Sequence, residues 1–175
     1  MLEDRVLFVV DCQNLYYGSK EEFVKDKRVS FGRLRYWLYK RCKPSSMHSL
    51  ACVALSSGTI KRLVEYLERA GYEVTQKISR NCGDNTISNT DIDAKASVEI
   101  ISRIDNFDRL IMASGDSDFI PVYQYCKNKG KRVEVVCFRS SFNRDLLQVV
   151  DSVTFLGSEV TYPHEEERGS TGGTS

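Results

Sequence analysis

The sequence lacks the closely spaced histidines and cysteines that bind structural zinc. Its two histidines, His48 and His164, are far apart, and its six cysteines form no Cys-x-x-Cys pair. A tetrahedral zinc site takes its ligands from such pairs, so no structural zinc site is expected. Most of the cysteines fall in apolar or amphipathic stretches rather than in a framework of loops, and we interpret them as reduced thiols.

The chain also lacks a long hydrophobic run and an excess of charge. Its first residues, MLEDRVLFVVDCQNL, carry acids and an apolar run too short for a signal-peptide core or a membrane span, so we expect a cytoplasmic protein without membrane contact. Lys and Arg total 25 against 24 Asp and Glu, and this balance gives no general attraction to nucleic acid. A basic surface for such a partner must therefore be local.

A length of 175 residues with 41% hydrophobic residues suits one compact domain. We place this domain at residues 1–160. Residues 161–175 are charged and then rich in Gly, Ser and Thr, and we expect them to form a disordered tail. The polar, Asn-rich residues 79–90 predict a long loop of the kind that can form a flap over a site.

Short apolar runs alternate with amphipathic segments along the domain. Continuous runs of Val, Ile, Leu and Phe are typical of parallel strands that are covered on both faces. The expected strands are 6–10, 50–55, 72–78, 110–113, 133–138 and 153–156, and the expected helices are 31–41, 59–70, 91–104, 119–128 and 142–150. Ser30 is the expected N-cap of the first of these helices, and Gly71 ends the second. The alternation predicts a three-layer α/β/α sandwich with a mainly parallel central sheet.

Acidic residues follow two of the expected strands where each strand ends. Asp11 follows the first strand, and Asp116 and Asp118 follow the fourth. Ligands of open α/β sheets bind beyond the carboxyl ends of the strands, so we expect these carboxylates to share one site. Asp93, at the start of the helix expected at 91–104, is the fourth candidate. Four carboxylates repel one another without a cation, and hard oxygen ligands favour Mg²⁺ or Mn²⁺.

Helix capping is the alternative role for several of these acids. Asp91 has an ordinary N-cap position, Thr90 and Asp93 have the spacing of a capping box, and Asp118 precedes an expected helix. Asp11 differs, because a carboxylate that closes a buried strand with no lysine or arginine nearby in the sequence has no evident structural partner.

Together these segments resemble the NYN domains, a branch of the PIN-like nucleases that includes the LabA-like proteins. FVVDCQNLY resembles the opening strand of the family, and TDIDAKASVEI resembles its central helix start, where Asp93 is followed six positions later by Glu99. ASGDSDFIPVYQYCKNKGKRVEVVCF resembles the GDSDF segment with its helix and the next strand. RSSFNRDLLQVVDSVTFL resembles the closing turn, helix and Asp. The resemblance runs from residue 5 to residue 156.

The resemblance implies the PIN-like, Rossmann-like fold and hydrolysis of RNA, in particular single-stranded RNA, with Mg²⁺ or Mn²⁺ as cofactor. The catalytic residues that it implies are Asp11, Asn14, Asp93, Asp116 and Asp118, of which the four aspartates are the metal ligands. The family usually has a basic residue and a glycine before the central Asp, where this chain has Thr90 and Asp91. Lys95, in the next turn, is the basic residue that can take over the substrate contact.

A local basic segment lies at residues 25–43, which hold eight basic residues and one acid, interleaved with tyrosine and tryptophan. Basic side chains contact phosphates and aromatic rings stack on unpaired bases, so the segment suits single-stranded RNA; a solvated helix face is the alternative. The candidate RNA contacts are Arg33, Arg35, Lys40, Lys95, Arg139 and Ser140. Ser114 is a weaker candidate for a bond to a ligating carboxylate or to the phosphate, because serine at a strand end is commonly a turn residue.

Two other classes of phosphate-handling enzyme fit less well. A haloacid-dehalogenase-type phosphatase needs a second Asp two residues after the first, where this chain has Gln13. A Toprim-type site pairs an early glutamate with a later Asp-x-Asp, whereas the early acid here is Asp11. The remaining alternative is an RNA-binding or scaffold protein that keeps the fold without turnover, and a homodimer is compatible with either function.

Overall fold

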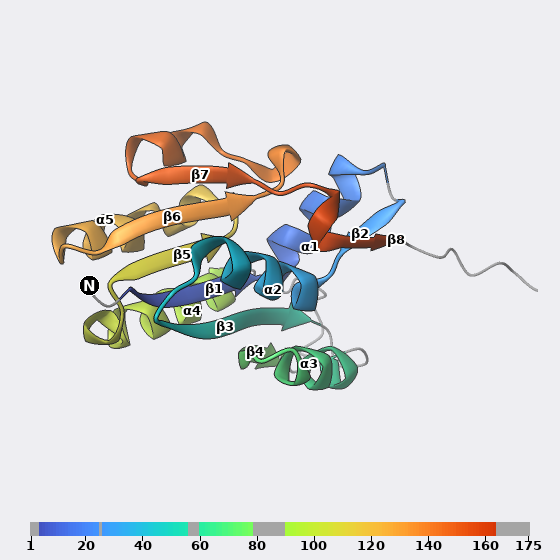
Figure 1. Ribbon diagram of the computed structural model, residues 1–175, viewed down its shortest axis with the longest axis horizontal. Helices are drawn as coiled ribbons and strands as arrows, with labels where there is room; N and C mark the ends of the chain where they lie inside the picture. The colour runs from blue at the N-terminus through green and yellow to red at the C-terminus, as the bar shows by residue number, and fades with distance from the viewer. Residues whose placement is uncertain (1–3, 25, 56–59, 79–89, 164–175) are drawn as a thin grey trace, which may run out of the picture.

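The computed structural model describes residues 4–24, 26–55, 60–78 and 90–163 (Figure 1). Its centre is a sheet of six parallel strands in the order β4-β3-β1-β5-β6-β7. The strands are β1 (Arg5–Asp11), β3 (Ser46–Leu55), β4 (Glu73–Ile78), β5 (Arg109–Ala113), β6 (Arg132–Cys137) and β7 (Ser152–Phe155). The α-helices are α1 (Cys12–Glu22), α2 (Phe31–Cys42), α3 (Ile60–Arg69), α4 (Thr90–Ser102) and α5 (Ile120–Asn128). The predicted α/β/α sandwich is confirmed.

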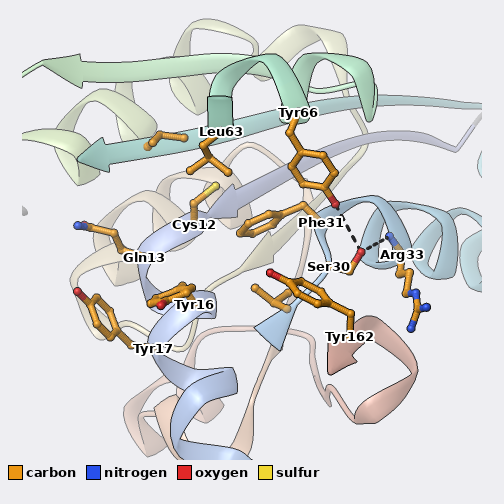
Figure 2. A pocket seen from close by; sticks show the side chains of 12 residues that line it. Cys12, Gln13, Tyr16, Tyr17, Ser30, Phe31, Arg33, Leu63, Tyr66 and Tyr162 are labelled. Atoms are coloured by element: carbon orange, nitrogen blue, oxygen red, sulfur yellow. Dashed lines mark hydrogen bonds between the residues drawn. The ribbon is translucent and has the colours of Figure 1, made fainter. Parts of the chain in front are cut away.

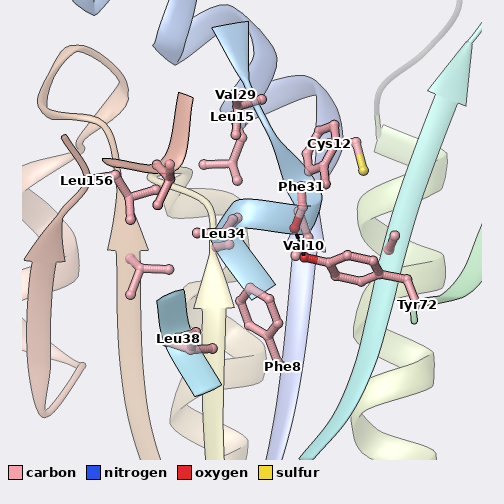
Figure 3. Packing of buried hydrophobic residues seen from close by; sticks show 14 of the residues in the cluster. Phe8, Val10, Cys12, Leu15, Val29, Phe31, Leu34, Leu38, Tyr72 and Leu156 are labelled. Carbon is pink, nitrogen blue, oxygen red and sulfur yellow. Dashed lines mark hydrogen bonds between the residues drawn. The ribbon is translucent and has the colours of Figure 1, made fainter. Parts of the chain in front are cut away.

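Alternate residues of the central strands feed two separate cores. Phe8 and Val10 of β1 pack against α1, α2 and α3, for example with Leu34, on one face of the sheet (Figure 3). Val9 lies on the opposite face with α4 and α5, for example with Ile100. Both sets are almost fully buried, which explains why the strands are continuously apolar in sequence.

The predicted helix signals act as expected at α2 and α3. The Ser30 side chain accepts a hydrogen bond from the backbone N–H of Arg33, and α2 ends at Lys43 in the left-handed conformation, with φ of 44°. Gly71 follows α3 with φ of 89°, a conformation that glycine adopts without steric cost. Both boundary predictions are confirmed.

The structure differs from the predicted secondary structure in several places. Helix α1 was not predicted, and β3 begins at Ser46 rather than at residue 50. The helix expected at 142–150 is a short 3-10 helix, η4 (Arg144–Gln148), in which only Leu146 is buried. One buried side chain gives little apolar contact to hold a longer α-helix on the sheet. A small antiparallel pair of strands was also not predicted: β2 (Lys27–Val29) pairs with β8 (Thr161–Pro163). Strand β8 thus lies within residues that were assigned to the C-terminal tail, while residues 164–175 and 79–89, on which the predictions of a tail and a flap depend, lie outside the described residues.

The topology creates a switch point between β1 and β5. The chain leaves β1 toward β3 on one side of the sheet and leaves β5 toward β6 on the other. Where connections diverge in this way, the carboxyl ends of the two strands open a crevice in which α/β proteins bind ligands. The β2–β8 pair stands beyond this same edge, on the side to which the arrows of β3, β6 and β7 point (Figure 1).

Within the described residues, no helix combines the length and the apolar character needed to cross a membrane. The described cysteines, Cys12, Cys42, Cys52, Cys126 and Cys137, are all free thiols. All but Cys42 are buried, and burial raises the pKa of each of these thiols. They act as small core residues rather than as nucleophiles.

Candidate metal centre

The turn that leaves β5 is held by hydrogen bonds of its polar side chains to backbone N–H groups and to Asp11. Asp116 precedes the 3-10 helix η2 (Ser117–Phe119) and accepts the backbone N–H of Asp118 at 2.9 Å. The hydroxyl of Ser114 accepts the N–H of Asp116 at 3.3 Å and donates to the Asp11 carboxylate at 3.2 Å. Ser114 is fully buried, so it joins the ends of β1 and β5 from inside.

Asn14 and Gly115 fix the same turn from the side of α1. The Asn14 side-chain oxygen accepts the N–H of Gly115 at 3.0 Å. A Cβ atom at Gly115 would lie 2.1 Å from the carbonyl oxygen of Ser141, a distance that no side chain tolerates. The carbonyl of Gly115 also accepts the N–H of Asn143 at 3.1 Å. The glycine of the GDSDF segment is therefore required by a close approach of two backbones.

Three carboxylates meet at this edge of the sheet. Asp93 is supplied by the first turns of α4, and Asp116 and Asp118 by the turn after β5; one oxygen from each lies within 4.8 Å of the other two. Ligands of Mg²⁺ stand about 2.1 Å from the ion, so opposite ligands are about 4 Å apart and neighbouring ligands about 3 Å apart. The three oxygens would move closer together to share one hard cation.

The electrostatics of the cluster favour a cation. The pKa of Asp93 is raised to about 6 from 3.8, first by burial and then by the negative charges of Asp11, Asp116 and Asp118. A positive ion at the centre of the three carboxylates offsets this repulsion. The donor set, made only of carboxylate oxygens, is the kind that Mg²⁺ and Mn²⁺ prefer.

Asp11 lies behind the cluster rather than within it. Its carboxylate caps α1 by accepting the backbone N–H groups of Gln13 at 3.1 Å and Asn14 at 3.0 Å, and it also accepts from Ser114. The expectation that Asp11 has no structural partner is therefore wrong. Burial raises its pKa, the hydrogen bonds oppose this rise, and the negative charge of Asp116 adds to it. The 8% exposed side chain remains close enough to Asp116 to interact with it through its charge.

The capping alternatives have different outcomes. The residue before α5 is Phe119, no side chain caps this helix, and Asp118 therefore does not have the capping role. The capping box of Asp93 depends on Thr90, whose side chain, like that of Asp91, lies outside the described residues. Glu99, the second acid of the helix motif, forms an ion pair with Arg103 and is not part of the three-carboxylate cluster.

The basic residues predicted along α2 have separate environments. The guanidinium of Arg33, near the start of the helix, donates to the carbonyl of Thr161. Arg35 is partly buried and donates to the hydroxyl of Ser49 at 3.0 Å. The ammonium group of Lys40 lies 5.6 Å from the centre of the Tyr36 ring. Lys40 is about 10 Å further along the helix than Arg33. Since α2 runs from the carboxyl edge of the sheet toward its amino edge, Arg33 is the member nearest the crevice.

The other predicted contacts lie at the carboxyl edge. Lys95, on α4, donates to the carbonyl of Gln76 at 3.2 Å. Arg139 follows β6, and its guanidinium stands 4.1 Å from the centre of the Phe155 ring. Ser140 donates its hydroxyl to the carbonyl of Gly18 at 2.8 Å. Lys95, Arg139 and Ser140 are all exposed, so their positions permit contact with a ligand at this edge.

A cavity of about 760 Å³ beside the start of α1, shown in Figure 2, was not predicted from the sequence. Four tyrosines from three different elements line it, together with other residues of α1, α2 and α3. The lining tyrosines are Tyr16, Tyr17, Tyr66 and Tyr162. The one signal in the sequence was the Tyr-Tyr pair directly after the Asp-Cys-Gln-Asn-Leu segment.

Comparison with known proteins assigns the chain to a family. A family model of the NYN domain matches residues 5–157. The chain belongs to the NYN-domain family. NYN domains belong to the PIN-like nuclease superfamily, so membership supports a nuclease that acts on nucleic acid, and the three-carboxylate cluster agrees with the divalent metals that these nucleases use.

Structural similarity agrees with the NYN fold. The crystal structure of VPA0982, a protein of unknown function from Vibrio parahaemolyticus, is similar with a TM-score of 0.75 and 21% sequence identity. The alignment covers 91% of this chain and 97% of that chain. At this identity the similarity shows the fold alone. Among curated proteins, none matches the sequence.

Proposed function

We propose that this NYN domain hydrolyses phosphodiester bonds of single-stranded RNA with Mg²⁺ or Mn²⁺ as cofactor. The observation that carries the proposal is the meeting of Asp93, Asp116 and Asp118 within 4.8 Å at the topological switch point. These three side chains would hold the cation directly. A divalent ion at such a site supplies charge neutralisation for the phosphate and activation of water.

The residues behind the cluster have a positioning role in this proposal. Asp11 and Asn14, with Ser114, tie the start of α1 to the turn after β5, and this turn carries two of the three carboxylates. Groups that orient metal ligands affect metal affinity strongly. Asp11 adds a second layer of negative charge that increases the preference of the site for a cation.

Basic side chains around the same edge would hold the substrate. Lys95 would replace the basic residue that the family usually has before the central Asp, and Arg139 and Arg33 lie toward the same carboxyl edge of the sheet. Contacts of this kind neutralise backbone phosphates and position the chain without reading its sequence. Lys40 is the least suitable of the predicted contacts, because it lies toward the amino edge of the sheet.

The test is cleavage of a labelled single-stranded RNA by purified protein in Mn²⁺. Wild type should cleave, Asp116→Asn should not, and Asp105→Asn is the matched control, since Asp105 is exposed and lies in η1 (Ile104–Asn106) before the amino end of β5. A DNA of the same sequence, incubated in parallel, tests the preference for RNA. Equal cleavage by Asp116→Asn and wild type would overturn the proposed site. Binding of RNA without cleavage would favour the RNA-binding alternative.

A further inference from the structure

The cavity next to the metal centre has an unusual aromatic lining. Tyr16 and Tyr17 come from α1, Tyr66 from α3, and Tyr162 from β8, and Figure 2 shows their side chains around one hollow. The four tyrosine residues are 40 to 56% exposed. Phe31 and Leu63 also line the cavity. Aromatic rings held open in this way can stack on a planar ligand.

The polar groups of the cavity suit an anionic ligand with hydrogen-bonding edges. Arg33 is the single charged residue among the described residues that line it, and no described carboxylate does. Gln13 offers an amide, which donates and accepts, and Ser30 a hydroxyl. The Tyr66 hydroxyl is held in place by the N–H of Gly32 at 3.1 Å. The positive guanidinium and the absence of negative charge are complementary to a phosphate group.

Two residues that line the cavity are neighbours in sequence of Asp11, which lies behind the metal centre. Cys12 and Gln13, which line the cavity, directly follow Asp11, and they belong to the first turn of α1 that Asp11 caps. The start of α1 therefore forms the boundary between the carboxylates and the tyrosines. Both therefore lie at the carboxyl edge of the sheet, near the ends of β1 and β5.

We propose that this cavity is a base-binding subsite, in which one unpaired nucleobase of a single-stranded nucleic acid stacks on the tyrosine rings while Arg33 contacts a neighbouring phosphate. The inference rests on the proposed function, because it assigns the cavity to the same substrate. Its size is in the usual range for pockets that enclose small ligands, about 300 to 1,000 Å³. A stacked base is held without strict sequence preference, since every base has a flat π face.

The subsite is tested by binding rather than by cleavage. A fluorescent eight-nucleotide RNA is titrated in EDTA at low salt, so that metal-dependent hydrolysis does not occur. Tyr162→Ala should weaken binding about tenfold, as expected for the loss of one base–aromatic stack, whereas Tyr162→Phe should retain the affinity because it keeps the ring. Tyr162 is 45% exposed, so its truncation should leave the fold intact. Tyr125→Ala is the matched control, since Tyr125 is partly exposed, does not line the cavity and lies on α5, outside the basic segment at residues 25–43.

A scan with abasic residues locates the base. Eight RNAs, each lacking one base, are compared on wild type and on Tyr162→Ala. One position should lose affinity on wild type, and the same position should show no further loss on the variant. Identical scan profiles for the two proteins, or an equal effect of the control, would overturn the subsite. Because binding is measured without metal, loss of the subsite and loss of the cleavage activity are separate results.

Discussion

Removing the charge of Asp93 should stabilise the metal-free protein at neutral pH. The pKa of this carboxyl is about 6 in the fold against 3.8 in an ordinary environment, so the folded protein binds the proton more tightly than the unfolded chain. Because the pKa of this carboxyl is higher in the fold, the protein loses stability as the pH rises from 3.8 to about 6. Above about pH 6 the full loss of folding free energy is present. Asp93→Asn removes the ionisation and hence this cost.

The size of the effect follows from the pKa and the exposure. A rise from 3.8 to about 6 has an upper limit of about 3 kcal/mol. Asp93 is only partly buried, and screening by solvent reduces this to roughly 1 kcal/mol. For a domain of this length, a gain of that size raises the melting temperature by about 2 to 4 °C.

The assay is thermal unfolding in EDTA at pH 3.5 and pH 7.5, followed by the same measurement at pH 7.5 with added Mn²⁺. Asp93→Asn should exceed wild type at pH 7.5 and equal it at pH 3.5, while Mn²⁺ should raise the melting temperature of wild type more than that of the variant. Asp105→Asn should show neither difference. A variant that is less stable than wild type in EDTA at pH 7.5 would refute the claim that burial and the neighbouring negative charges make ionised Asp93 destabilising.

Two further predictions concern the turn that carries the carboxylates. Gly115→Ala should destabilise the protein by about 3 kcal/mol in a denaturant titration, because its Cβ would lie 2.1 Å from the Ser141 carbonyl oxygen; a change below 1 kcal/mol would show that the two backbones separate easily. Asn14→Ala leaves the N–H of Gly115 without its acceptor and should cost about 2 kcal/mol. The same variant should bind Mn²⁺ about tenfold more weakly by calorimetry, and unchanged affinity would argue against the positioning role.

The sequence predicts the sheet well because its signals are local. The central strands are buried on both faces and are therefore continuously apolar, as residues 6–10 and 110–113 are. The helix signals at Ser30 and Gly71 are equally local, since a cap or a left-handed residue acts within one turn. The prediction of an α-helix at residues 142–150 was wrong because the apolar spacing of this segment fits an α-helix, whereas only one leucine is buried and the segment forms a 3-10 helix.

The site is less predictable because it depends on where side chains point. Sequence places Asp11 at the end of a strand, yet it does not reveal that α1 begins at the next residue and takes the carboxylate as its cap. Asp93 is in the cluster because α4 starts at the carboxyl edge and faces the turn after β5. The tyrosine cavity was missed for a related reason, since Tyr66 and Tyr162 are almost a hundred residues apart and meet only in the fold.

The arrangement of the acids explains how one turn can be rigid and still carry a negative charge that favours cation binding. Asp11 and Asp116 both use their carboxylates to accept backbone N–H groups, and these bonds hold the charges in place without neutralising them. Asp118 and Asp93 have no such hydrogen bond among the described residues, so their repulsion is left for an ion to offset. The two kinds of carboxylate therefore have different roles. A carboxylate that is fixed by backbone hydrogen bonds sets the position of the site, and one that is not so fixed contributes the negative charge that attracts the cation.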